Sequence, residues 1–178
     1  MTESTTKITP ALRLGSMLLD HAITCFALVI VLLPFLLFSI FKGFTGTAST
    51  EILTPAFSGD LLLMSAVFAI YYCKDSIDGR SMAKRITKLQ VVDARSGATA
   101  GAIRCCIRNL TIPIWPLEVL ITLFSPTRRL GDFIAGTKTV AFDNAKDKMP
   151  ANWANIIVAF LIGFAFTVLL FYGMFRII

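Results

Sequence analysis

The sequence predicts an all-α integral membrane protein with three full transmembrane helices, a short re-entrant or interfacial helical segment, and a small two-stranded β ladder on the cytoplasmic side. Composition is the first observation behind this class. Of the 178 residues, 56% are hydrophobic and 16% are charged, and the mean hydropathy is +0.74, whereas soluble domains are nearer half apolar and a quarter charged. The second observation is that uncharged apolar runs of membrane-spanning length recur along the chain. A disordered, collagen-like or disulfide-stabilised small protein is therefore excluded.

Two of the three predicted spans are built on uncharged runs. Residues 23–41 form the first run, and adding residues 14–22 makes a helix long enough to cross a hydrocarbon core of ~30 Å with tilt. Pro34 lies inside it, which membrane helices tolerate. Residues 156–175 form the last span, and Trp153 and Tyr172 can anchor its ends at the membrane interfaces.

The second predicted span covers residues 58–77 and is less regular. Its centre, residues 61–72, is apolar, and Lys74 and Asp75 close it. Its 20 positions are enough to cross a bilayer.

The segment 110–124 is predicted to enter the membrane and return, or to lie at its surface. It is only 15 positions long and contains two prolines and a glutamate. The loop 73–108 before it carries eight Lys and Arg residues, and the loop 125–152 after it carries five. A full crossing would place these basic loops on opposite sides, whereas basic loops concentrate in the cytoplasm. We therefore expect a cytoplasmic amino terminus and a final span that ends outside.

Two short stretches have the pattern of strands. Residues 88–93 alternate and are rich in β-branched side chains, and residues 137–142 follow Gly136 in a similar pattern. If both loops lie on one side of the membrane, these stretches can pair into a small ladder.

Asp20 lies about two turns inside the first predicted span. An intramembrane carboxylate costs ~2.5–3.5 kcal/mol on insertion scales, so it normally faces a bundle interior or a water path. Arg13 is seven residues earlier on the same helix face. Two interpretations stay open: an Arg13–Asp20 ion pair that orients the helix, or a protonatable Asp20 in an ion or proton path. His21, the single histidine, is interpreted as interfacial, because one histidine makes no metal site.

A second cluster of charged and glycine positions lies in residues 128–137. Gly131 precedes Asp132, and Gly136 can permit a close approach of the backbone. The cluster is interpreted either as a structural turn leading into the second strand or as a source of charge pairing through Asp132.

Three basic residues on the same side are candidate partners for Asp132: Arg13, Arg104 and Arg108. Arg108 and its neighbour Asn109 enter the re-entrant segment. They can bind lipid head groups or pair with Asp132.

No catalytic, cofactor or metal site is predicted. The chain has no HExxH, GxSxG, GxxxxGK[ST] or GxGxxG motif, and its four cysteines form no CxxC. We expect the protein not to be an enzyme. The formal charge of +6 needs no nucleic-acid partner, because basic loops beside membrane spans account for it.

At these residues the chain resembles the RDD family, membrane proteins named for one arginine and two aspartates. The matching residues are Arg13, Asp20 and Asp132, the last within Leu-Gly-Asp-Phe-Ile-Ala-Gly-Thr. Residues 78–93 are similar to the middle motif of the family, and residues 108–109 match its Arg-Asn step.

The resemblance covers residues 11–143, which are predicted to form the membrane domain. Residues 1–10 are expected to be an amino-terminal tail, and residues 144–178 a linker with an additional carboxyl-terminal helix. Ala83 departs from the glycine that the family often has before its lysine.

The resemblance implies an integral protein of the bacterial cytoplasmic (inner) membrane that transports ions or small solutes, for example by cation/proton exchange. Arg13, Asp20 and Asp132 would form its charge cluster. The secondary candidates are His21, Arg108, Asn109, Gly131 and Gly136. The alternative is a non-catalytic scaffold or accessory subunit of a larger membrane complex. The expected partners are the lipid bilayer and either further copies of the chain or that complex.

Overall fold

The computed structural model describes residues 8–45, 59–142 and 152–177. The elements follow in this order: α1 (Pro10–Phe44), α2 (Gly59–Tyr72), α3 (Met82–Ile86), β1 (Leu89–Asp93), α4 (Ala102–Asn109), the 3-10 turn η1 (Ile112–Ile114), α5 (Trp115–Phe124), α6 (Leu130–Ala135), β2 (Thr137–Ala141) and α7 (Trp153–Ile177).

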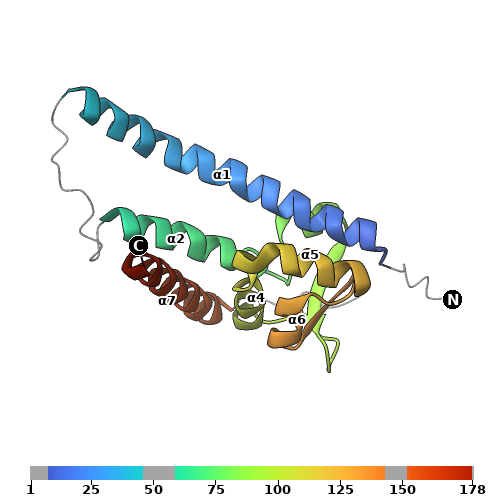
Figure 1. Ribbon diagram of the computed structural model, residues 1–178. Helices are drawn as coiled ribbons and strands as arrows, with labels where there is room; N and C mark the ends of the chain where they lie inside the picture. The colour runs from blue at the N-terminus through green and yellow to red at the C-terminus, as the bar shows by residue number, and fades with distance from the viewer. Residues whose placement is uncertain (1–7, 46–58, 143–151, 178) are drawn as a thin grey trace, which may run out of the picture.

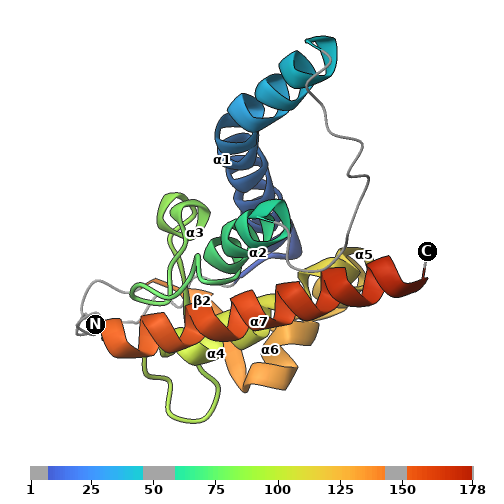
Figure 2. The same cartoon turned by 90° about the vertical axis from the view of Figure 1, so that its left-hand side faces the viewer.

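The first helix is much longer than a membrane crossing needs. α1 has 35 residues, or ~52 Å at 1.5 Å per residue. The Thr9 side chain accepts a hydrogen bond from the Leu12 amide, and Pro10 lies in the first turn, where its missing N–H is not needed. Among its described side chains, every buried one lies at or before Asp20. Beyond that point α1 stands apart from the other helices (Figures 1 and 2).

The second helix is shorter than predicted. α2 has 14 residues and ends at Tyr72, whereas the prediction for this span was residues 58–77. The chain turns after α2, with positive φ at Asp78 and Gly79. Asp75, which the prediction included in the span, is held by side chains from other elements.

α2 and α7 run side by side, and α4 packs against the same part of α7 (Figure 1). The buried centre of this contact consists of Tyr72, Cys106 and Ala159 with their neighbours. Gly163 of α7 makes the close approach, since a Cβ there would lie 3.4 Å from the Tyr72 ring. α7 is therefore part of the core of the fold.

Residues 102–124 do not form one continuous helix. α4 ends at Asn109, the turn η1 follows, and α5 begins at Trp115. Pro113 explains the break, because proline has no N–H to donate to the carbonyl four residues earlier. Pro116 lies in the first turn of α5, where the missing donor costs nothing.

The predicted ladder is confirmed. β1 and β2 are each one residue shorter than predicted and pair antiparallel, with Leu89 opposite Ala141 and Asp93 opposite Thr137. This pairing joins the segments on either side of α4, η1, α5 and α6.

Three stretches of the described residues are long and apolar enough to cross a membrane: Pro10–Phe44, Ala102–Phe124 and Trp153–Met174. The predicted membrane-type helical fold is thereby confirmed. The second of these long stretches is residues 102–124, however, and α2 is only a shorter apolar helix.

Candidate functional site

The candidate site lies where the first turns of α1 meet the turn after α2 and the segment from α3 to α6. Arg13, Met17 and Asp20 recur at helical spacing and share the one buried face of α1. This face contacts α3 and α5. The sequence produces the arrangement because charged residues occupy positions where a membrane helix would otherwise carry apolar ones.

Asp132, in the first turn of α6, is the centre of the first part of the site. Its Oδ2 lies 3.4 Å from Arg13 Nη2, and its Oδ1 lies 2.9 Å from Arg108 Nε. The contact with Arg108 Nε is an ion pair without a hydrogen bond. Thr137 donates a hydrogen bond of 2.7 Å to Oδ1, and the Arg129 amide donates one of 3.2 Å to Oδ2. Burial raises the pKa of Asp132, but the nearby arginines outweigh it and hold the pKa at about 2.

The second part of the site links Asp20 to Asp75 through one lysine. Lys84 of α3 donates hydrogen bonds of 3.0 Å to Asp20 Oδ2 and 2.8 Å to Asp75 Oδ1. Lys74 Nζ lies 3.8 Å from Asp20 Oδ2. Burial raises the pKa of Asp75, but the charges of Lys84 and Arg108 lower it by more, so the net shift is downward.

The third part joins α4, α5 and α6 through Glu118. Arg129 Nη1 donates a hydrogen bond of 2.9 Å to Glu118 Oε2. Its Nη2 donates to the Asn109 side-chain oxygen, and Thr111 donates to Glu118 Oε1. Asn109 also donates to the Tyr72 carbonyl oxygen at 2.8 Å. One buried carboxylate thus fixes the three helices around the break at η1.

The three parts form one continuous network, because Arg108 lies between Asp132 and Asp75, and Asn109 lies between Asp75 and Arg129. Four acidic and four basic side chains in it are buried: Asp20, Asp75, Glu118, Asp132, Arg13, Lys84, Arg108 and Arg129. Buried charges are costly unless they are paired and hydrogen-bonded. Each of the eight has an ion-pair partner within the network, and together they join five helices and the turn after α2.

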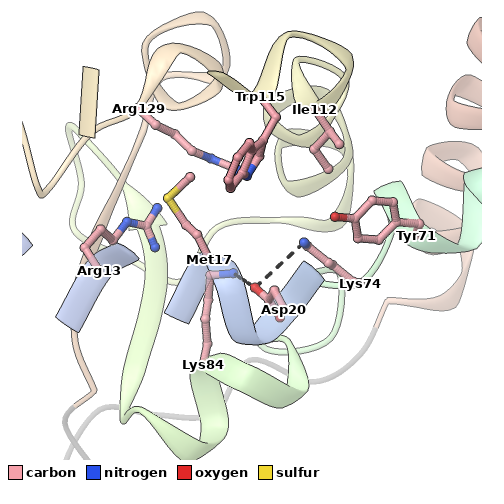
Figure 3. A pocket seen from close by; sticks show the side chains of 9 residues that line it. All are labelled: Arg13, Met17, Asp20, Tyr71, Lys74, Lys84, Ile112, Trp115 and Arg129. Atoms are coloured by element: carbon pink, nitrogen blue, oxygen red, sulfur yellow. Dashed lines mark hydrogen bonds and ion pairs between the residues drawn. The ribbon is translucent and has the colours of Figure 1, made fainter. Parts of the chain in front are cut away.

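A small cavity borders the network beside Asp20 (Figure 3). Its volume of ≈ 10 Å³ is room for about one water molecule. Five charged side chains line it: Arg13, Lys74, Lys84, Arg129 and Asp20. Trp115 and apolar neighbours complete the lining. Lys74 lies outside the spanning helices, and burial lowers its pKa to about 8 although Asp20 opposes the shift.

Replacing Gly131 by alanine is expected to destabilise the site. A Cβ at Gly131 would lie 1.8 Å from the Arg108 carbonyl oxygen and 2.6 Å from Thr111 Oγ1, so α4 and α6 would have to separate. We expect a loss of about 1–3 kcal/mol, seen as a lower melting temperature of the purified protein. Gly15→Ala is the control, since nothing lies within 4 Å of its new Cβ. Equal melting temperatures for the two variants would contradict this account of the close approach.

The structure brings most of the predicted site residues together, but not all in the predicted pairs. Arg13 and Arg108 both contact Asp132, as the sequence suggested, whereas Arg104 pairs with Asp93 at the surface. The Arg13–Asp20 pair is wrong. The two side chains share a helix face, but Arg13 reaches α6 and Asp20 reaches α3.

The other predicted residues have structural surroundings that sequence alone did not give. Arg108 and Asn109 are fully buried, so they cannot reach lipid head groups. The close approach expected at Gly136 occurs at Gly131; Gly136 instead has a left-handed φ of 64° at the end of α6. The His21 ring forms a hydrogen bond of 3.3 Å with the Tyr71 hydroxyl and stacks on Trp115. The His21 side chain is exposed overall.

Several network residues were missed. Asp75, Lys84 and Glu118 were not among the predicted site residues, yet all three are buried. A usable signal was present at Glu118, because a carboxylate within an apolar segment needs a partner. Among the described residues, no group of three His, Cys, Asp or Glu side chains is placed to hold a metal ion.

Comparison with known protein families matches residues 9–176 to the RDD family. The match continues past residue 143 and includes nearly all of α7, which was predicted to lie outside the family region. No curated protein and no solved structure matches the chain.

Proposed function

Since this chain belongs to the RDD family and is a membrane-type protein with apolar helices, we propose that it transports a small ion across the membrane, coupled to a proton, through the Asp20 cavity. One observation carries the proposal. Among the described residues, the ion-pair partners of Asp20 are two lysines and no arginine, and Asp20 borders the water-sized cavity. Lysine can release a proton near neutral pH when buried, whereas arginine cannot.

Charge balance favours the exchange of a proton for a monovalent cation. Three of the bases that line the cavity pair with acids other than Asp20: Arg13 with Asp132, Arg129 with Glu118, and Lys84 with Asp75. Lys74 is therefore the remaining base beside Asp20. With Lys74 charged, the cluster has five bases and four acids. When the proton leaves Lys74 Nζ, a monovalent cation at Asp20 restores the same charge. The cavity would then alternate between proton and cation at constant charge.

Flux through reconstituted vesicles tests the proposal. Purified protein in proteoliposomes that contain a pH-sensitive dye is exposed in turn to sodium, potassium and lithium gradients. We expect at least one inward cation gradient to raise the pH of the lumen faster than it does in protein-free vesicles. No excess over protein-free vesicles with any of the three cations would contradict the proposal.

The pH dependence of flux should follow Lys74. Below its pKa of about 8, the charged ammonium group competes with a cation for Asp20; above it, the group is neutral. Flux should therefore rise as pH increases through about 8. Lys74→Arg keeps the positive charge at every accessible pH and should suppress flux throughout. Lys88→Arg, at an exposed position, is the control, and a Lys74→Arg profile identical to it would exclude Lys74 as the proton carrier.

The proposed topology places the amino terminus and both strands in the cytoplasm. Because β1 and β2 pair, the segment between them must end on the side where it began. With one long apolar stretch in that segment, residues 102–124, the chain is proposed to enter the membrane and return. The basic residues around the strands favour the cytoplasmic side.

Cysteine labelling checks this topology. An impermeant thiol reagent should reach Lys138→Cys only after the cytoplasmic side is opened. It should reach Gly59→Cys, at the start of α2, in intact cells. The parent chain measures the background from native cysteines. Labelling of Lys138→Cys in intact cells would contradict the proposed topology.

A path of this kind requires more than one copy, because so few spans cannot enclose it. The outer part of α1 supports assembly: none of its most apolar window is buried within the chain. The same observation favours the second candidate function, an accessory subunit that docks on a different membrane protein. α7 is a poor candidate for that docking surface, because it packs on α2 and α4.

A further inference from the structure

A second hollow lies on the surface beside α4 and α6, away from the Asp20 cavity. Its volume is ≈ 610 Å³, and Arg95, Arg104, Arg128, Phe133 and Ile134 are among the residues that line it. We call it the α6 groove. α6 lies against α4, so the groove is bordered by a helix of the apolar stretch 102–124 (Figure 1).

The charge of the groove is strongly positive. Arg95 and Arg128 form no ion pair with any described residue. Arg104 is half exposed and pairs with Asp93, which neutralises only one of the three guanidinium groups. Guanidinium groups bind phosphate oxygens with two parallel hydrogen bonds, so this surface fits a phosphate or phosphodiester.

Exposed apolar side chains lie beside these arginines. Phe133 and Ile134 are 54% and 62% exposed, and the Arg128 guanidinium carbon lies 5.8 Å from the centre of the Phe133 ring. α5, which contacts α6, also has exposed apolar side chains: Leu120 is 54% and Phe124 is 89% exposed. A soluble anion would leave this surface in water, whereas a lipid would cover it with its acyl chains.

We infer that the α6 groove binds the head group of an anionic phospholipid, with the phosphate at Arg95 and Arg128 and the acyl chains against Phe133, Ile134 and α5. Charge complementarity and the exposed apolar side chains beside the arginines both favour this occupant. The inference is independent of the transport proposal, because it uses none of the residues around Asp20.

Lipid binding to the purified full chain tests the inference. Native mass spectrometry of detergent-solubilised protein would measure retention of added phosphatidylglycerol and, separately, of phosphatidylcholine with the same acyl chains. The test variant is Arg95→Gln with Arg128→Gln. The control variant, Arg85→Gln with Lys88→Gln, removes the same charge from exposed positions outside the groove. Melting temperatures would confirm that both variants are folded.

We expect phosphatidylglycerol to bind more tightly than phosphatidylcholine. The test variant should weaken phosphatidylglycerol binding by roughly thirtyfold, since each basic residue near an anionic surface contributes on the order of a factor of five. The control variant should bind like the parent. Phe133→Ser with Ile134→Ser should also weaken lipid binding.

Three results would overturn the inference. The first is equal retention of the two lipids by the parent chain. The second is equal loss in the test and control variants, which would indicate a general effect of net charge. The third is full displacement of phosphatidylglycerol by an equal concentration of glycerol 3-phosphate, which would indicate a site for a small soluble anion.

Discussion

Replacing Asp132 by asparagine is expected to prevent most of the protein from reaching a stable folded state. The substitution removes the carboxylate that Arg13 and Arg108 share, and both guanidinium groups are fully buried. Breaking a buried pair by removing one partner typically costs about 3–5 kcal/mol, because the remaining charge stays buried. Folded domains have about 5–15 kcal/mol of stability in total. Fluorescence size-exclusion chromatography and melting in detergent measure the loss.

Arg104→Gln is the matched control for this effect. It breaks the ion pair with Asp93, but the Arg104 side chain is half exposed. Exposed pairs contribute only about 0–1 kcal/mol. The control should therefore elute and melt like the parent protein. If Asp132→Asn also behaved like the parent, the buried network would not be what holds α1 on α6.

Asp20→Asn is expected to abolish flux while the protein remains folded. The difference from Asp132 lies in the partners. After the substitution, Lys84 still donates to Asp75 at 2.8 Å, and Lys74 remains 15% exposed and can reach water. Lys74 loses its acid partner, but burial already lowers its pKa to about 8, so it can release its proton, and the melting temperature should stay close to that of the parent. The site for the exchanged cation is lost, and flux should fall to the level of protein-free vesicles.

The control for Asp20→Asn is the same exchange at Asp78. Asp78 has a φ of 58°, a conformation that asparagine also adopts readily, and it does not line the cavity. Asp78→Asn should retain both melting temperature and flux. Undiminished flux in a folded Asp20→Asn protein would remove Asp20 from the mechanism and leave it a structural residue.

Local sequence patterns predicted the parts of the fold that depend on neighbours in the chain. Alternation of β-branched residues located both strands. The length of segment 110–124 and its flanking basic loops led to the prediction of a re-entrant or interfacial segment, which stays a prediction. The partners of Asp132 were also foreseeable. A carboxylate in a tight loop between basic segments is expected to pair with a nearby arginine or lysine. Two of the three suggested partners, Arg13 and Arg108, contact Asp132.

The misses share a physical cause. Asp75 and Lys84 occur in a segment rich in Lys and Arg, where composition indicates a solvated loop. Their burial depends on Asp20 from α1 and Arg108 from α4, and such long-range pairing leaves no local pattern. The helical spacing of Arg13 and Asp20 misled for a related reason. Shared position on a helix face shows that two side chains point the same way, not that they bond to each other.

The structure places the family charges in two different surroundings. Asp132 and Arg13 lie within a fully paired network that joins α1 to α4 and α6. Asp20 lies at its edge, beside a cavity and two lysines. In the transport proposal the first pair maintains the fold and Asp20 takes part in exchange. The chain is then its own transporter, built from several copies that meet along the exposed part of α1.

The subunit composition of the natively extracted protein tests this central claim most directly. Mild detergent extraction followed by affinity purification and native mass analysis would give the mass and identity of every stoichiometric subunit. The account predicts a homo-oligomer of this chain. A single copy bound at fixed stoichiometry to a different membrane protein would contradict it and would favour the accessory-subunit function.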